Sequence, residues 1–542
     1  MDSQPPWDYI VVGSGFGGSV AALRLVEKGW RVLLLEKGSR LAEQDFARTN
    51  WNLRRWLWAP ALGFRGPFRM SFLRHVTALT GVGVGGGSLV YANTLPLPRD
   101  DFFAAPSWAH LGDWKGELTR HYATAARMLG ATENPLTTFP DEVLAEVARD
   151  LGREAGFEKT RVGVWFGQPG ETVPDPYFGG EGPERTGCIH CGGCMLGCRH
   201  GAKNTLDRNY LWLAERRGLT LRADAEVTWI RPADGGYEVT ALEGRSPLRA
   251  LRRRRTYRTR GVVLAGGVLG TVPLLLELRA APDGLPGLSA RVGDAVRTNE
   301  EVLIGVVSQR RDRAMSEGVA ITSILHTDNH SHLEPVRYSD GSGLFRLLMA
   351  PHAPGRTWAA RLAAMGGRVL RQPVRTLRAL LVPDLARHTL ILLYMRTLDG
   401  RLALRLGRRP LAGFRRALVS SVSAGRAPTA AIPEATALAE RVAEKVDGYP
   451  MSLATEGLLG TPTTAHILGG CVMGKDAEEG VVDARNRVFG YPDLFVVDGS
   501  AVSANPGVNP ALTITALAER AMSFVEARRG PTVAVGEARP DR

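Results

Sequence analysis

A glycine-rich turn close to the start of the chain sharply limits the possible folds. It follows a mostly apolar run, residues 9–12, and reads Gly-Ser-Gly-Phe-Gly-Gly over residues 13–18. A helix-like stretch then extends to Lys28, and a second apolar run, Val32–Leu35, follows and leads into Glu36. The order of strand, glycine turn, helix and strand is typical of a dinucleotide-binding βαβ unit. The pattern therefore predicts an α/β fold.

Each conspicuous residue of this unit has a physical reason to be there. Gly13 permits the tight turn, Gly15 lets the backbone approach a pyrophosphate, and Gly18 lets the helix pack closely on the strand. Glu36 stands where an acidic side chain can accept hydrogen bonds from an adenosine ribose, and an acid there disfavours a 2'-phosphate. The alternative, a glycine-rich turn before an ordinary helix, is disfavoured by the complete unit around it.

Length and composition favour a large soluble protein. A chain of 542 residues is too long for one compact core, and its 44% apolar and 23% charged residues are ordinary for globular proteins. The N-terminus has no basic region followed by an apolar stretch, and apolar runs such as Leu390–Met395 are far shorter than the roughly 18 residues of a membrane span. We expect a cytoplasmic protein, either free or peripheral on the inner face of the membrane.

The net charge of +13 raises the question of nucleic-acid binding. The densest basic run, Arg252–Arg255, lies between the strand-like segments Tyr237–Leu242 and Gly261–Leu264 and has no aromatic residues among its arginines. This placement favours a solvated hairpin over a nucleic-acid surface.

Two other basic stretches suggest contact with a membrane. Residues 51–75 and 353–383 contain several arginines, no acidic residue, and aromatic or apolar residues in between. In the second stretch, Trp358, Leu362, Met365 and Val369 fall on one helical face. Such a composition suits a membrane interface, where aromatic rings lie at the headgroups and cations meet anionic lipid. The alternative is that both stretches pack into the core or a subunit interface with their arginines outside.

Four blocks of sequence carry a resemblance to a known family. They are the glycine turn, residues 81–93, residues 225–227 ahead of 262–267, and residues 464–517. Together they resemble the glucose-methanol-choline (GMC) flavoprotein oxidoreductases, and within them the branch of bacterial cholesterol oxidases. The resemblance implies FAD rather than NAD. It also implies non-covalent FAD, because Leu89, Val90 and Tyr91 stand where other members carry a linking histidine.

The fold implied by the resemblance is a Rossmann-like FAD-binding domain with an interleaved α+β substrate-binding domain. We assign residues 1–40, 75–98, 200–298 and 480–542 to the FAD-binding domain. The substrate-binding domain then takes residues 41–74, 99–199 and 299–479, including a cysteine loop at 188–198.

Oxidation of an alcohol by a flavin removes a hydride from the carbinol carbon and a proton from the hydroxyl. A neutral imidazole and an amide near the flavin can orient the hydroxyl and accept that proton. Carried over from the family, these groups are His466 and Asn509. In the cholesterol oxidase branch a glutamate acts as the base of a steroid isomerisation; the nearest candidate is Glu334, for which an ion pair with Arg337 is an alternative.

The resemblance also implies further cofactor contacts. Gly86, Gly87 and Ser88 are expected near the pyrophosphate and ribityl chain, Val227 against the adenine, and Asp498 and Gly499 near the ribityl phosphate end. Asn93 takes the place of an asparagine followed by glycines in secreted relatives. The full set of expected cofactor-binding residues is Gly13, Gly15, Gly18, Glu36, Gly86, Gly87, Ser88, Asn93, Val227, Asp498, Gly499 and Asn509.

The resemblance does not explain a dense run of cysteines at Cys188, Cys191, Cys194 and Cys198. Its C-x2-C-x2-C-x3-C spacing equals that of the bacterial ferredoxin ligands, although no proline follows and no second run exists. Three interpretations stay open: an Fe-S cluster, a zinc ion held by the four thiolates or with His190 or His200 replacing one of them, or a structural loop of disulfides or free thiols.

These observations predict FAD-dependent oxidation of a hydrophobic secondary alcohol, most plausibly a 3-hydroxysteroid such as cholesterol, with reoxidation by O2. One alternative is a dehydrogenase of another lipophilic or long-chain alcohol that passes electrons to a different acceptor, through an Fe-S cluster at the cysteine loop. Another is a flavin redox module without an alcohol substrate. The sequence indicates no nucleic-acid partner and does not indicate an oligomeric state.

Overall fold

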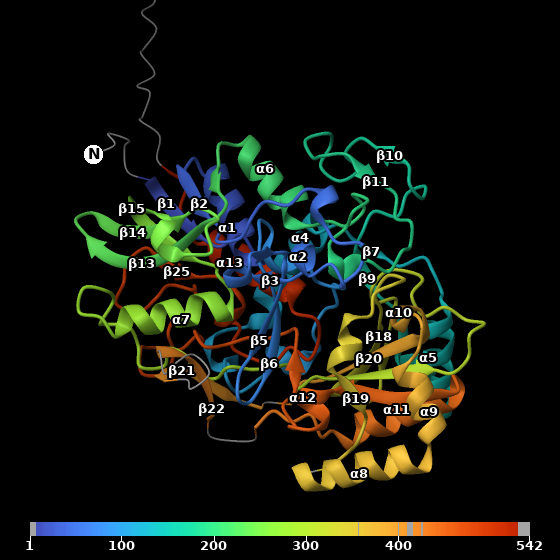
Figure 1. Cartoon of the computed structure of the whole chain (residues 1–542). Helices are drawn as coiled ribbons and strands as arrows, with labels where there is room; N and C mark the ends of the chain where they lie inside the picture. Colours follow the sequence, from blue (N-terminus) through green and yellow to red (C-terminus); the bar gives the residue numbers. More distant parts are fainter. Residues whose placement is uncertain (1–6, 356, 399, 409–415, 424–426, 529–542) are drawn as a thin grey trace, which may run out of the picture.

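The computed structural model describes residues 7–355, 357–398, 400–408, 416–423 and 427–528. Within this part of the chain two seven-stranded sheets form separate layers, at the upper left and lower right of Figure 1. Each has its own hydrophobic core, and the segments between them build the remaining walls of a shared cavity.

The first sheet contains the predicted unit. Strands β1 and β2 flank helix α1 and pair in parallel, which confirms the predicted strand–helix–strand order. The strand order is β12–β2–β1–β15–β14–β13, with β25 also paired to β15. The bounds are β1 (Trp7–Val12), β2 (Val32–Leu35), β12 (Thr220–Arg222), β13 (Ala225–Ala233), β14 (Gly236–Glu243), β15 (Arg253–Leu264) and β25 (Leu494–Val496).

The long strand β15 belongs to two pairing patterns. Its last residues pair in parallel with β1 and β25, and its first residues pair antiparallel with β14. The basic run predicted to lie in a solvated hairpin falls at this antiparallel start, where Arg253 and Arg254 are exposed. Tyr9, Ile10 and Val11 of β1 and all four residues of β2 are buried, as expected for parallel strands covered on both faces.

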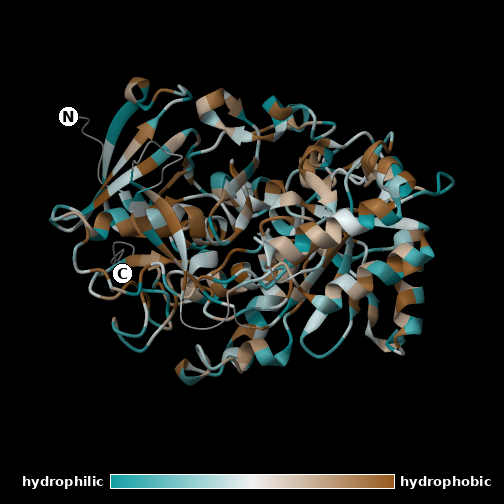
Figure 2. Ribbon diagram, turned by 60° about the horizontal axis from the view of Figure 1, so that its bottom comes forward, coloured by the Kyte–Doolittle hydropathy of each residue, from teal (hydrophilic) through white to brown (hydrophobic). Residues whose placement is uncertain are grey.

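Helices cover the first sheet. Helix α1 starts directly after the glycine turn and packs against α6 and α13, and α13 in turn packs against α4. Helix α7 contacts β13 (Figure 1). The bounds are α1 (Phe16–Glu27), α4 (Trp114–Met128), α6 (Tyr210–Arg216), α7 (Val268–Arg279) and α13 (Ala511–Ser523). Figure 2 shows hydrophobic and hydrophilic residues alternating along the outer helices, as expected for helices that bury one face.

The second sheet is antiparallel at every strand pair. Its order is β19–β23–β16–β20–β18–β17–β8. The bounds are β8 (Phe157–Lys159), β16 (Val302–Ser308), β17 (Ser323–His326), β18 (Ser331–Val336), β19 (Met349–Pro351), β20 (Thr389–Arg396) and β23 (Gly448–Leu453).

One face of this sheet packs against helices and the other lines the cavity, because successive side chains along a strand point to opposite faces. On β16, Val302, Ile304 and Val306 join a core with helices α5 and α11, whereas Leu303 and Gly305 line the cavity. The helices on this side of the molecule are α5 (Phe139–Asp150), α8 (Trp358–Arg371), α9 (Pro373–Leu380), α10 (Leu385–His388), α11 (Pro433–Lys445) and α12 (Ala454–Gly457).

Smaller elements connect the two layers. Strand β24 pairs in parallel with β6, which places the segment just before His466 beside residues 77–81. The remaining elements are α2 (Leu53–Trp56), α3 (Asp100–Phe103), β3 (Trp58–Ala59), β4 (Phe64–Arg65), β5 (Phe68–Phe72), β6 (Thr77–Gly81), β7 (Ala131–Glu133), β9 (Arg161–Gly163), β10 (Thr172–Val173), β11 (Arg185–Thr186), β21 (Leu402–Arg408), β22 (Arg416–Val422) and β24 (Thr463–Thr464).

The strands of the first sheet come from the segments assigned above to FAD binding, and those of the second sheet from the segments assigned to the substrate domain. The exact domain boundaries stay a prediction. Among the described residues, no helix combines the length and apolar character needed to span a membrane.

Candidate active site

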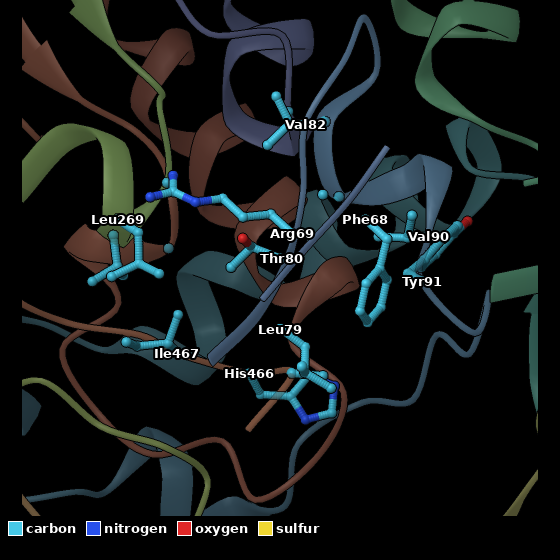
Figure 3. Close-up of a pocket in the computed structure, with 18 of the residues that line it drawn as sticks. Phe68, Arg69, Leu79, Thr80, Val82, Val90, Tyr91, Leu269, His466 and Ile467 are labelled. Atoms are coloured by element: carbon cyan, nitrogen blue, oxygen red, sulfur yellow. The ribbon is translucent and has the colours of Figure 1, made fainter. Parts of the chain in front are cut away.

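A single large cavity joins the two layers. Its volume is about 680 Å³, and its walls include the glycine turn after β1, the ends of β2 and β15, and the inner face of the second sheet. Figure 3 shows Val82 and Arg69 toward one end and His466 toward the other. Of the predicted site residues, the cavity is lined by Gly13, Gly15, Glu36, Gly86, Gly87, Val227, His466, Asp498, Gly499 and Asn509.

The glycine turn brings three loops into close contact. Gly13 has a φ of +100°, and a Cβ there would lie 2.5 Å from the carbonyl oxygen of Ala265. A Cβ on Gly17 would lie 2.0 Å from the carbonyl oxygen of Val497, so the start of α1 packs against the segments after β15 and β25. Gly18 does not line the cavity; a Cβ there would lie 2.0 Å from the carbonyl oxygen of Gly13.

Gly15 differs from its neighbours because the space beside it is open. A Cβ there would approach only the carbonyl oxygen of Ala265, at 4.0 Å, and the residue lines the cavity. Gly86 approaches from the other side, where a Cβ would lie 2.6 Å from the Cα of Gly15. The two glycines make a narrow backbone cradle at the N-terminus of α1, where unpaired N–H groups favour an anion.

Glu36 is buried at the end of β2 and lines the cavity. Its Oε2 accepts hydrogen bonds from the backbone N and the Oγ of Ser14, at 3.0 and 2.8 Å, and its Oε1 accepts one from the backbone N of Gly38. The carboxylate thus also fixes the shape of the glycine turn.

Asp498 lies in the cavity wall, where the loops that follow β15 and β25 meet. It accepts hydrogen bonds from the backbone N of Gly267 and the Oγ1 of Thr271, and burial raises its pKa above the ordinary value. It ties the loop after β15 to the loop after β25, and Gly499 beside it lines the cavity.

Besides Gly18, two predicted contacts lie outside the cavity wall, Ser88 and Asn93. Ser88 is buried; its Oγ donates to the carbonyl of Gly85 and accepts from the backbone N of Leu206. Asn93 is also buried, has a φ of +61° and lies on the cysteine-loop side of the chain, near Cys194. Both residues therefore lie behind the cavity wall rather than in it.

The cavity wall also contains two cations that the sequence analysis missed. Lys37 and Arg69 line it close to Glu36 and Glu226. Burial, and secondly the charge of Arg69, lowers the pKa of Lys37 to about 8, and burial lowers that of Arg69. Lys37 directly follows Glu36, and this position next to a predicted cofactor contact was the one signal in the sequence that could have identified it.

His466 lies at the other end of the cavity. Its Nδ1 is 2.6 Å from Oε2 of Glu301, and the other oxygen of Glu301 accepts hydrogen bonds from the backbone N of Ala465 and of His466. Burial opposes a charged imidazole, but the contact with Glu301 outweighs it, and the pKa of His466 is raised. Because Glu301 holds Nδ1, Nε2 is the ring nitrogen available to a ligand.

Glu301 was not identified from the sequence, although it positions the histidine. It follows two residues with positive φ, Asn299 at +58° and Glu300 at +40°, a conformation that costs energy for residues other than glycine. Asn299 also donates from Nδ2 to the carbonyl of Val508 and accepts from the backbone N of Gly507. One strained segment thus holds the loops that carry His466 and Asn509.

Asn509 and Glu334 are neighbours. Nδ2 of Asn509 lies 3.3 Å from Oε2 of Glu334, and the buried Oδ1 of Asn509 has no hydrogen-bond partner among the described residues. Asn509 lines the cavity, so this unpaired acceptor is available to a ligand donor. Glu334 itself is fully buried behind Asn509 and does not line the wall.

The proposed ion pair between Glu334 and Arg337 is not formed. Arg337 instead donates to Oγ1 of Thr138, Oγ1 of Thr322 and the carbonyl of Glu317. The two side chains diverge because residues separated by three positions lie on opposite faces of a strand.

We expect Glu301→Gln to move the pH profile of the enzyme. The carboxylate favours the imidazolium, so removing its charge lowers the pKa of His466 and shifts the corresponding limb of the kcat/KM profile to lower pH. The raised pKa also means that the pair stabilises the fold at pH values below the unfolded-state pKa, and that this contribution is lost as pH rises through the folded-state pKa. A pH series of kcat/KM and Tm tests both statements, and coinciding profiles for the two proteins would contradict them.

The structure does not support a metal centre at the cysteine loop. Cys188 is buried against Val162 and Val164, with Cys194 and Cys198 packed on the same apolar cluster, whereas Cys191 is exposed. In the part of the chain that the structure describes, no three His, Cys, Asp or Glu side chains converge as a metal-binding group. All five cysteines are free thiols. The predicted metal ligands Cys188, Cys191, Cys194 and Cys198 are therefore not supported, for either Fe-S or zinc.

The two arginine-rich stretches have different positions. In residues 51–75, Trp56 and Phe68 are buried and stack at 4.4 Å, and Arg69 lines the cavity, so much of this stretch is interior. In the second stretch, helices α8 and α9 lie at the lower edge of the molecule in Figure 1. Arg356 lies outside the described residues.

Comparisons with known proteins agree with this geometry. Family models described as GMC oxidoreductase match residues 183–281 and 401–518, and one described as an NAD(P)-binding Rossmann-like domain matches residues 11–45. The chain is 44% identical to a protein named cholesterol oxidase from Acinetobacter baumannii, over 96% of this chain and 95% of that protein. It is 46% identical to a cholesterol oxidase from Mycobacterium tuberculosis, over 96% and 91% of the two chains. The fold resembles the crystal structure of pyridoxine 4-oxidase from "Mesorbium loti", with a TM-score of 0.59 and 16% identity over 96% of this chain and 99% of that one.

Proposed function

Because this chain belongs to the GMC oxidoreductase family and is an FAD-dependent alcohol oxidoreductase, we propose that its substrate is a 3-hydroxysteroid such as cholesterol. The observation that carries this proposal is the apolar wall beside the two polar groups His466 and Asn509. A steroid alcohol is a rigid hydrocarbon with one hydroxyl, and the names of the two relatives at 44% and 46% identity point to the same substrate class.

The apolar wall comes from the inner face of the second sheet and the segments near it. It contains large side chains from three neighbouring strands and few polar groups, as expected for a pocket that binds a hydrocarbon. Its residues include Leu303, Val336, Phe345, Met349, Ile391 and Leu393.

The nucleotide end of the cavity fits FAD. The backbone cradle of Gly15 and Gly86 leaves room where side chains would intrude, and the N-terminus of α1 points into it. We assign Glu36 to the ribose, Val227 to the adenine, and Asp498 with Gly499 to the ribityl phosphate end. When bound there, FAD supplies a two-electron acceptor for the hydride.

We assign the hydroxyl of the substrate to His466 and Asn509. Nε2 of His466 accepts the hydroxyl proton, and Asn509 fixes the oxygen. Glu301 holds the imidazole ring in one orientation, since it binds both Nδ1 and the backbone N of His466. The raised pKa of His466 means that the neutral, proton-accepting form becomes dominant only at a higher pH than for a free imidazole.

The experiment that tests the substrate is anaerobic reduction with cholesterol dispersed in detergent, followed by the flavin absorbance near roughly 450 nm. We expect the absorbance to bleach and then to recover when air is admitted, because we propose O2 as the acceptor. Bleaching that persists in air would contradict O2 as the acceptor. Absence of bleaching would exclude cholesterol and direct the search to long-chain alcohols.

We also propose that the enzyme docks on membranes through α8 and α9. Apolar side chains are exposed along one side of both helices: Trp358, Leu362 and Leu370 on α8, and Val374, Leu377 and Leu381 on or next to α9. Arg371 and Arg378 are exposed beside them, and the sequence from 353 to 383 has no acidic residue. An apolar face with cations at its margin suits an anionic lipid surface.

The position of α8 connects this face to the substrate. Helix α8 packs against α9 and β19, and β19 contributes Met349 to the cavity wall. A sterol leaving the lipid would therefore enter on the side of the molecule that carries the docking face.

We expect the double variant Leu370→Glu/Leu377→Glu to bind vesicles containing anionic phospholipid at least about tenfold more weakly, because two exposed leucines lose their burial in lipid. Co-sedimentation measures this. The matched control is Leu97→Glu, which changes another exposed leucine away from these helices. Equal sedimentation of the double variant, the control and the unchanged protein would contradict the docking proposal.

A further inference from the structure

A row of buried and half-buried ionisable side chains leads from the cavity to the surface. It begins at Glu334, which is 0% exposed and contacts Asn509 through Oε2. Its other carboxylate oxygen, Oε1, lies 3.2 Å from Nε2 of His332, whose side chain is only 3% exposed. Burying a carboxylate beside an imidazole costs desolvation free energy, which hydrogen-bond partners must offset. A pair that is kept at this cost invites a functional explanation.

The row continues across the sheet. His326 on β17 lies directly opposite His332 on β18, so both rings project from the same face. Their centroids are 5.7 Å apart with an interplanar angle of 61°. His326 is partly exposed, and its Nε2 lies 3.3 Å from Oε1 of Glu158 on β8. The Glu158 side chain is 60% exposed and meets solvent.

The surroundings of the row are apolar on its inner section. On the neighbouring strand β20, Leu393 faces Glu334 and Met395 faces His332. Charges act on the groups at both ends of the row. At the cavity end, Glu334 is among the groups that raise the pKa of His466. At the surface end, the hydrogen bond from His326 lowers the pKa of Glu158. Burial opposes this effect, and the charges of His326, Arg99 and His332 add to it.

We propose that Glu334, His332, His326 and Glu158 form a proton route between the reaction cavity and solvent. The inference rests on the proposed function, because it takes the hydroxyl of the substrate to lie at His466 and Asn509. An imidazole suits such a route, since it accepts a proton on one nitrogen and releases one from the other. Gaps longer than a hydrogen bond, including that between the two rings, are crossed through a bridging water.

The chemistry of the reaction requires an outlet of this kind. In the oxidation the O–H and one C–H bond of the alcohol break and the C=O bond forms. The two electrons of the C–H bond leave with the hydride to FAD, which is reduced, and the alcohol is oxidised. The hydroxyl proton goes to His466, crosses to Glu334 and His332, and an equivalent proton leaves from His326 and Glu158 to water. The same route returns a proton when O2 is reduced to hydrogen peroxide.

The test compares His326→Gln with His330→Gln in the FAD-loaded enzyme. His330 lies on the loop between β17 and β18, is exposed, and is near Asp101 rather than the row, so it is a matched substitution outside the route. Anaerobic stopped-flow mixing with a 3-hydroxysteroid follows flavin bleaching and, with an indicator dye, the appearance of the proton in solution.

In the unchanged enzyme and in His330→Gln we expect the proton to appear together with bleaching. In His326→Gln we expect proton appearance to lag by about tenfold or more, and imidazole in the buffer to restore it, because the lost group is near the surface. A merely structural role for His326 would not produce a lag that imidazole repairs. Synchronous proton release in His326→Gln would overturn the route.

A second readout does not depend on turnover. In the FAD-loaded enzyme labelled with 15N-histidine, the ring N–H of His332 should exchange with solvent more slowly in His326→Gln and at an unchanged rate in His330→Gln. If the steroid fails to bleach the flavin of the unchanged enzyme, the proposed substrate is wrong, and the exchange rate then tests the route by itself. An exchange rate of His332 that is identical in all three proteins would overturn it.

Discussion

We expect His466→Gln to lower kcat/KM for alcohol oxidation by about 10²- to 10⁴-fold while the protein keeps its FAD. Glutamine can hydrogen-bond to a hydroxyl but cannot accept its proton near neutral pH. The substitution also removes the ring that Glu301 holds through Nδ1 at 2.6 Å. Steady-state kinetics together with the flavin absorbance of the purified protein measure both parts of the expectation.

The matched control for this variant is His110→Gln, which changes an exposed histidine that pairs with Glu479. It should retain the kinetics of the unchanged enzyme. Activity of His466→Gln close to that of the control would remove His466 from the reaction. Loss of FAD from His466→Gln would make its role one of folding or cofactor retention instead, which would contradict the assignment as a proton acceptor.

The second large effect is expected at Gly15. Gly15→Val should abolish FAD binding while leaving the fold intact, because a Cβ at Gly15 meets only the carbonyl oxygen of Ala265, at 4.0 Å, and the residue lines the cavity that FAD must enter. The backbone at Gly15 is extended, with φ at −70°, so valine introduces no left-handed strain. Flavin absorbance after purification, circular dichroism and Tm separate loss of the cofactor from loss of the fold.

Gly366→Val is the matched control, since Gly366 in α8 also has no atom within 4 Å of an added Cβ and lies away from the cavity. It should bind FAD normally. If Gly15→Val still purifies with a full complement of FAD, the pyrophosphate does not pass the cradle formed by Gly15 and Gly86. A side chain at Gly17 would prevent folding, because its Cβ would lie 2.0 Å from the carbonyl oxygen of Val497. If Gly15→Val also fails to fold, the space beside Gly15 is not open in solution.

Much of the fold and part of the site could be predicted because their signals are local. The turn from Gly13 to Gly18 needs glycine for contacts made within a few residues of it, so its sequence indicates the strand–helix–strand unit directly. His466 and Asn509 were located by flanking motifs, and the structure places both on the wall of one cavity. Their catalytic roles remain predictions until the variants are measured.

Other features had no local signal. The cysteine spacing suggested a metal, but spacing along the chain does not determine direction in space, and the loop turns Cys188 inward and Cys191 outward. Two stretches that both combine arginines with aromatic or apolar residues and lack acids became an interior segment and an exposed helical face, since composition does not say which side of a segment is covered.

The sequence by itself determined the family and the dinucleotide-binding unit, and its flanking motifs indicated His466 and Asn509 as candidates for the reaction. Tertiary structure alone decided which groups act together. Glu301 reaches His466 across 165 positions, and Glu334 reaches Asn509 across 175. Such contacts depend on how the two sheets pack around the cavity, and no pattern of neighbouring residues encodes them, because hydrogen bonds and charge interactions depend on distance in space rather than along the chain.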